Sequence, residues 1–120
     1  MRNFRKLEIW RQGIEIVKKV YQLSVELPAE EKFGLKSQIT RAAISILSNI
    51  AEGSSRNSEI EFKRFLEIAQ DSLFELETQF IIIEELRFIE TDKVTTIIEL
   101  FHKESKMINA LITKIKTAKG

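Results

Sequence analysis

The chain has 120 residues, of which 43% are hydrophobic and 31% charged, and its formal net charge is +1. This composition is typical of one globular domain over residues 1–120, excludes a disordered chain, and identifies no partner by bulk charge. The lack of cysteine excludes disulfides, thiolate catalysis and cysteine-type zinc sites. No apolar run reaches the ~20 residues that span a bilayer, and no signal peptide is recognisable, so we expect a cytoplasmic protein without membrane contact.

Apolar residues at helical spacing predict a first helix over about residues 7–26. Its apolar positions are Leu7, Trp10, Ile14, Val17, Tyr21 and Val25. Pro28 is expected to end this helix, because the residue before a proline is disfavoured in the helical region. Residues 29–33 then form a connector with room for one helical turn.

A second helix is predicted over about residues 34–52, with Gly53 as its C-terminal cap. One face is apolar, and the other carries a continuous row that we call the polar stripe: Gln38, Arg41, Ser45, Ser48, Asn49 and Glu52. Serine and asparagine are poor choices for a solvated helix face, because they compete with the backbone for hydrogen bonds. We therefore interpret the polar stripe as a surface that contacts another helix or subunit.

Ser58 and Glu61 form a capping-box pattern that predicts the start of a third helix, which continues to about Phe88. Thr91 is expected to cap a fourth helix, with Asp92 favourably placed against the helix dipole. Four long amphipathic helices with short connections predict an all-α fold, an antiparallel up-down-up-down four-helix bundle.

The third helix has more apolar surface than one core can bury. Phe80, Ile81, Ile82 and Ile83 are consecutive, and a 3.6-residue period directs them to different faces. Ile44 and Leu47 similarly lie off the main apolar face of the second helix. Such an excess favours a homo-oligomer, and the alternative is that these residues widen the core stripe.

Catalytic and metal-binding patterns are incomplete. Glu99 and His102 match the Glu-x-x-His pattern of di-iron bundles, but such sites need two of these motifs and the chain has one histidine. We therefore interpret His102 as a boundary or solvated residue. A nucleophilic triad and a glycine-rich phosphate loop are also missing. The chain is thus expected to be no enzyme and to use no cofactor, metal or small-molecule substrate.

The second and third helices are expected to be neighbours that share polar contacts. In that arrangement Arg41, Ser45 and Asn49 face a second row made of Ser72, Glu75 and Gln79. A buried arginine paired with a carboxylate fixes register more than it adds stability. The first expected pair is Arg41 with Glu75.

Charge is expected to separate along the bundle. The end with both termini and the second connection, here called the basic end, collects Arg2, Arg5, Lys6, Arg56, Lys114, Lys116 and Lys119. The opposite end collects Glu26, Glu30, Glu31, Glu84, Glu85, Glu90 and Asp92, partly offset by Lys32, Arg87 and Lys93. In a ring of parallel bundles the basic ends would converge and bind RNA or DNA backbones without reading sequence; the alternative is that they are ordinary solvated termini.

The central segment resembles a known family. Gln38-Ile39-Thr40-Arg41-Ala42-Ala43, Ser45-Ile46 and Ser48-Asn49-Ile50-Ala51-Glu52-Gly53 resemble the signature of bacterial four-helix bundle proteins encoded in intervening sequences of 23S rRNA genes. Leu27-Pro28 and Glu75-Leu76-Glu77-Thr78-Gln79 agree with it. As departures, Leu47 stands where proline is common, Asp71 where glycine is frequent, and Lys6 where Asp is frequent.

The resemblance implies a homopentamer of unknown biochemical function. The family is also similar to the accessory subunit of diversity-generating retroelements, a barrel-shaped pentamer that binds nucleic acid and a reverse transcriptase. The resulting prediction is a non-enzymatic homo-oligomer that binds nucleic acid as an accessory protein. The alternative is a structural or protein-interaction scaffold with no nucleic-acid role.

Overall fold

The computed structural model describes residues 2–119, and the surroundings of side chains for residues 2–118. Over this part of the chain it contains helices and no strand. The four α-helices are α1 (Glu8–Ser24), α2 (Leu35–Ser54), α3 (Glu59–Glu85) and α4 (Thr91–Lys119). Two short 3-10 helices, η1 (Phe4–Lys6) and η2 (Ala29–Glu31), precede α1 and α2. The all-α prediction is confirmed, and η2 supplies the helical turn for which the first connector has room.

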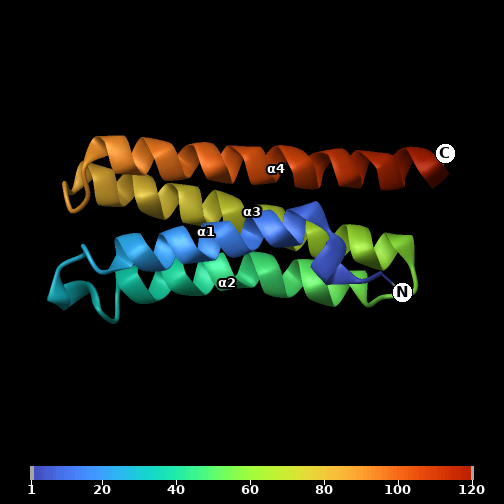
Figure 1. Cartoon of the computed structure of the whole chain (residues 1–120), viewed down its shortest axis with the longest axis horizontal. Coiled ribbons are helices and arrows are strands. Elements are labelled where there is room, and N and C mark those ends of the chain that lie inside the picture. The colour runs from blue at the N-terminus through green and yellow to red at the C-terminus, as the bar shows by residue number, and fades with distance from the viewer. Residues whose placement is uncertain (1, 120) are drawn as a thin grey trace.

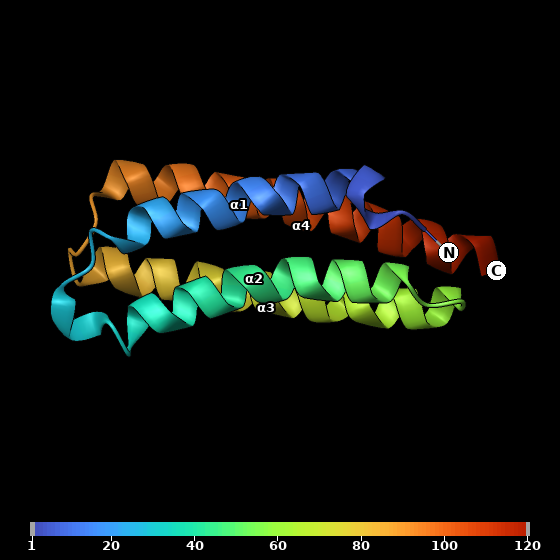
Figure 2. The same ribbon diagram turned by 60° about the horizontal axis from the view of Figure 1, so that its bottom comes forward.

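The four long helices lie side by side as a four-helix bundle with extents of 47 × 21 × 20 Å. Figure 2 shows α1 and α4 in one layer and α2 and α3 in the other. The chain ends and the α2–α3 connection lie at one end of the bundle, and the other two connections lie at the opposite end (Figure 1). No helix in the described residues is long and apolar enough to cross a bilayer.

The core runs the length of the bundle and takes apolar side chains from all four helices. Ile16, Ile39, Phe80 and Ile108 are each fully buried. The rings of Phe80 and Phe101 meet edge to face with centroids 5.6 Å apart, which joins α3 to α4. Because each helix buries one stripe, the opposite faces and the grooves between helices remain available for contacts with other molecules.

Both ends of α3 are fixed by local hydrogen bonds. The Ser58 hydroxyl accepts a bond from the Glu61 backbone N–H at 3.3 Å, which confirms the predicted N-cap. At the other end α3 stops at Glu85, three residues before the predicted end. Arg87 adopts a positive φ of 61°, and the Phe88 N–H bonds to the Ile83 carbonyl at 3.1 Å. This arrangement is a left-handed helix termination that the sequence did not indicate.

Two predicted caps differ from the structure. The prediction of Gly53 as a cap is wrong, since α2 continues to Ser54 and Gly53 is buried inside the helix. Thr91 is the first residue of α4 rather than its cap. The Glu90 carbonyl accepts the first bonds, from the N–H groups of Lys93 and Val94 at 3.1 and 3.2 Å. Gly53 instead packs against α3, where a Cβ added to it would lie too close to the Cβ of Phe65.

Candidate functional site

The structure brings the predicted basic residues to one end of the bundle, because η1, the α2–α3 connection and the end of α4 all lie there (Figure 1). Four of these side chains are exposed and form no salt bridge within the described residues: Arg5, Lys6, Lys114 and Lys116. The side chain of Lys119 lies outside the described part. Free cations on a shared end are the electrostatic requirement for contact with phosphates.

The other two predicted cations are engaged within the chain. The Arg2 guanidinium forms a salt bridge with Glu59 and lies 4.2 Å from the centre of the Phe62 ring. Arg56 pairs with Glu52 at 3.3 Å and lies 4.9 Å from the Phe65 ring. We interpret these two arginines as residues that hold the start of the chain and the α2–α3 connection against α3.

Acidic side chains gather at the opposite end, as predicted from the charge distribution. Glu26, Glu84, Glu85 and Glu90 line a hollow of about 770 Å³ there, together with one cation, Arg87. Nearby, Lys93 Nζ donates to Glu26 Oε2 at 2.8 Å. This hydrogen bond, followed by the charge of Glu26, raises the pKa of Lys93. The free cations and the acidic hollow therefore occupy opposite ends of the long axis.

The polar stripe forms two rungs between α2 and α3. Ser45 Oγ lies 2.9 Å from Ser72 Oγ. Two turns further along α3, Gln79 Nε2 donates to Gln38 Oε1 at 3.4 Å. Asn49 bonds within α2, where its Nδ2 donates to the Ser45 carbonyl at 2.8 Å. The prediction that Ser45 faces the third helix is confirmed by its contact with Ser72, whereas Gln79 contacts Gln38, which was not among its expected partners.

The expected ion pair between Arg41 and Glu75 is wrong for the isolated chain, because both side chains are exposed and no salt bridge joins them. Helix geometry explains the difference. At about 100° per residue, Gln38 and Ser45 share one direction, whereas Arg41 is turned about 60° outward. Arg41 therefore lies on the solvent side of the row, and Glu75 instead accepts a bond from Gln79 Nε2 at 3.5 Å.

The consecutive apolar residues of α3 separate as the helical period requires. Phe80 and Ile83 are fully buried, whereas Ile81 and Ile82 are 44% and 42% exposed. The large exposed apolar side chains of α3 are Ile60, Ile68, Phe74, Ile81 and Ile82. By contrast, α1 and α2 each contribute one such residue, Tyr21 and Ile44. Apolar surface of this kind on one helix is typical of an interface.

Sequence reasoning missed a groove between α3 and α4. It consists of two adjoining hollows, of about 720 and 370 Å³, that share Phe74, His102 and Ser105 as lining residues. The Phe74 side chain is 60% exposed at its edge. Phe74 and Ile81 are seven residues apart and therefore share a helix face, which is the signal that could have predicted the α3–α4 groove.

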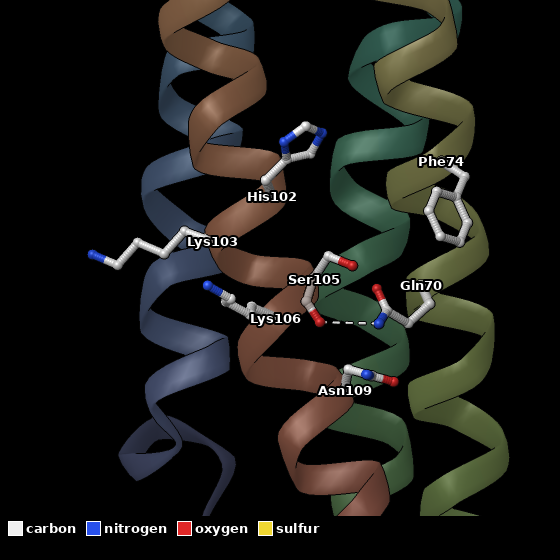
Figure 3. Close-up of a pocket in the computed structure, with 7 residues that line it drawn as sticks. All are labelled: Gln70, Phe74, His102, Lys103, Ser105, Lys106 and Asn109. Atoms are coloured by element: carbon white, nitrogen blue, oxygen red, sulfur yellow. Dashed lines mark hydrogen bonds between the residues drawn. The ribbon is translucent and has the colours of Figure 1, made fainter.

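Polar groups connect the two walls of the α3–α4 groove. Figure 3 shows Gln70 and Ser105 pointing toward each other, and Gln70 Nε2 donates to the Ser105 carbonyl at 3.0 Å. His102 Nε2 lies 3.0 Å from Glu77 Oε1. His102 is exposed, as predicted, and no cluster of three metal-ligating side chains occurs within the described residues. The α3–α4 groove therefore combines an exposed aromatic ring with polar groups from both of its walls.

Comparison with models of protein families shows the family to which the chain belongs. The model of the 23S rRNA-intervening sequence protein family matches residues 5–110. The chain belongs to this family. The match of this 23S rRNA-intervening sequence protein to the family model includes the polar stripe and the α3–α4 groove. It ends before Lys114 and Lys116, so half of the free cations lie outside it.

Among solved structures, the chain is similar to a crystal structure of a protein with unknown function from the S23 ribosomal protein family of Bacteroides thetaiotaomicron. The TM-score is 0.81 at 22% identity, and the alignment covers 87% of this chain and 97% of that chain. At this identity the likeness establishes a shared fold alone. A search of curated proteins found no match.

Proposed function

We propose that this 23S rRNA-intervening sequence protein is a non-enzymatic, antiparallel up-down-up-down bundle that assembles into a homo-oligomer and binds RNA or DNA as an accessory protein. The resemblance described above favours a homopentamer. The observation that carries the assembly is the exposed apolar surface of α3, in particular the face shared by Phe74 and Ile81, with Ile82 beside it. A monomer would leave these side chains in water at an unfavourable free energy.

Support for nucleic-acid binding comes from the free cations at the basic end. Arg5, Lys6, Lys114 and Lys116 are exposed there, and the acidic hollow lies at the far end of the bundle. In a ring of parallel subunits these cations would form one basic face. Such a face binds phosphate backbones by counterion release, so affinity falls steeply as salt rises. Fold likeness to other bundles does not by itself identify the ligand.

The proposal is tested by measuring the mass of the particle in solution with and without RNA. We expect a multiple of the 14.0 kDa chain mass, and a further increase with RNA at low salt that disappears at high salt. Replacing Arg5, Lys6, Lys114 and Lys116 by glutamate should abolish the increase. A matched control replaces four exposed lysines outside the basic end by glutamate, namely Lys18, Lys19, Lys32 and Lys103.

Equal loss of RNA binding in both variants would reject the basic end as the site, and a monomer of unchanged mass would reject the assembly. The α3–α4 groove favours one alternative, a scaffold that binds another protein through Phe74. That alternative predicts no salt-dependent increase in mass with RNA. It predicts instead a stable complex with one protein, lost when Phe74 is replaced by glutamate.

A further inference from the structure

Glu104 is a buried acid in the core of the bundle. It lies between Phe101 and Ile108 in the inward row of α4, and its side chain is 0% exposed. Neither Oε1 nor Oε2 has a hydrogen-bond partner. No other charged residue among those whose side chains are described is buried. A carboxyl group in this position is unfavourable as an anion, because nothing replaces the water that it loses on folding.

The carboxyl group lies where α4 meets α1 and α2. A Cβ added at Gly13 of α1 would lie 3.5 Å from Glu104 Oε2 and 2.7 Å from Leu47 Cδ2 of α2. Gly13 therefore presents bare helix backbone to Glu104, and Leu47 closes the space beside it. The backbone groups of Gly13 are used within its own helix, so this neighbour gives the acid neither a donor nor a charge.

No charged group from the surrounding elements faces Glu104. The charged residues nearest in sequence to its level on each helix are all exposed: Arg11 and Glu15 on α1, Arg41 and Glu52 on α2, Glu67 and Asp71 on α3, and Lys103 and Lys106 on α4. Burial raises the pKa of Glu104 to about 8, and no charged neighbour contributes to the shift. Geometry and electrostatics therefore agree that the neutral carboxyl group is the form that the core accommodates.

The seam between α1 and α4 passes beside Glu104 and has a hollow on each side of it. A hollow of about 280 Å³ lies along it on one side of the Glu104 level, lined by Leu7, Ile9, Met107 and Leu111 among others. Another of about 390 Å³ lies on the other side, lined by Gln22, Leu23, Thr96 and Leu100 among others. The hollows leave the α1–α4 contact incomplete on both sides of the Glu104 level, so this seam has fewer packing contacts there to hold water out.

We propose that Glu104 is a proton-binding site in the core and that loss of its proton loosens the seam between α1 and α4. The bundle is tight when the carboxyl group is neutral. When the group ionises, water must reach it, and the nearest route passes along the seam beside Gly13. This inference is independent of the proposed function, since it concerns the single chain.

The direction of the pH effect follows from the raised pKa. An unfolded glutamate titrates near about 4.3. Between this value and about 8, the folded chain holds one proton that the unfolded chain has lost. Stability from this group is therefore complete below pH ~4.3, falls as pH rises and reaches its lowest level above pH ~8. Over this window the unfolding equilibrium constant should rise by up to about tenfold per pH unit through Glu104.

The test measures urea unfolding of the whole protein at pH 5.5, 6.5 and 7.5, at one fixed chain concentration. In the wild type, the slope of the free energy of unfolding against pH includes the one proton bound by folded Glu104. Glu104→Gln and Glu104→Met should lack this contribution of about one proton. Glu99→Gln, at an exposed position of the same helix, is the matched control and should keep the wild-type slope. An unchanged slope in both Glu104 variants would overturn the proposal.

A second measurement follows the carboxyl group of Glu104 directly. In protein labelled with ¹³C at the glutamate carboxyl carbon, one resonance should titrate at a pH of about 8, and Glu104→Gln should lack it. If no glutamate resonance titrates apart from the rest, Glu104 is not a proton-binding site. If added Mg²⁺ changes the pH at which the Glu104 resonance titrates, the group binds a cation, and the proposal is also wrong. Hydrogen-exchange protection above pH 8 should fall first in α1, whereas an even loss over all four helices would reject the seam.

Discussion

Gly53 of α2 lies directly against Phe65 of α3: a Cβ added at Gly53 would lie 2.5 Å from the Phe65 Cβ and 3.1 Å from Phe62 Cδ1. The Cβ of Phe65 cannot move away without moving the α3 backbone. Gly53 therefore sets the distance between α2 and α3 at the basic end. The same two rings receive the guanidinium groups of Arg2 and Arg56, so this contact also positions η1 and the α2–α3 connection.

Gly53→Ala is expected to destabilise the protein. Overpacking costs about 1–3 kcal/mol, which should exceed the gain of up to about 1 kcal/mol from replacing a helical glycine. Gly13→Ala is the matched control, because its closest neighbour is the flexible end of Leu47, at 2.7 Å. Urea unfolding should place Gly53→Ala below Gly13→Ala in stability; the reverse order would contradict the assigned role of Gly53.

The rung between Ser45 and Ser72 should appear in a double-mutant cycle. Each single change to alanine leaves one half-buried hydroxyl without this partner and should lower the free energy of unfolding by about 1 kcal/mol. The double variant should lose less than the sum of the two single losses, because no unpaired hydroxyl of the pair remains. Strict additivity of the two losses would show that the hydroxyl groups do not interact in solution.

Phe74→Glu and Ile81→Glu should disrupt the proposed assembly while leaving each chain folded. Both side chains are exposed, at 60% and 44%, so the core stays intact. A glutamate in an apolar interface would be buried without a partner. Light scattering should report a mass close to 14.0 kDa, with helical circular dichroism unchanged. Thr95→Glu, at an exposed site on α4, is the control, and equal masses for all three variants would reject this face as the interface.

Glu104→Met should stabilise the protein at neutral pH. Because the pKa of Glu104 is about 8 in the folded chain, the group is mostly neutral there at pH 7. In the unfolded chain it is ionised at this pH, so folding requires it to take up a proton. The raised pKa corresponds to a penalty of roughly 3 kcal/mol at pH 7, which falls below about 1.5 kcal/mol at pH 5. Thermal unfolding at the two pH values should therefore show the larger gain for Glu104→Met at pH 7. A gain that is equal at both values would mean that packing, and not ionisation, is responsible.

Much of the fold could be predicted from local patterns. The Ser58 cap, the four helices and the burial of Phe80 and Ile83 follow from hydrogen-bonding residues and apolar spacing within one segment. The position of Glu104 was also detectable, because the apolar row of the fourth helix has a gap between Phe101 and Ile108. Its burial was not detectable, since a polar residue in such a gap can turn to solvent at a helix edge.

The sequence by itself determined the helices, their apolar faces, the family signature and the separation of charge between the two ends. These are properties of single segments and of their order along the chain. Only the tertiary structure decided that Gly53 packs instead of capping, that Arg2 and Arg56 are held within the chain, and that Glu104 lies without a partner. Each of these depends on which residues of different helices come within a few ångströms of each other, and no periodicity within one helix specifies that distance.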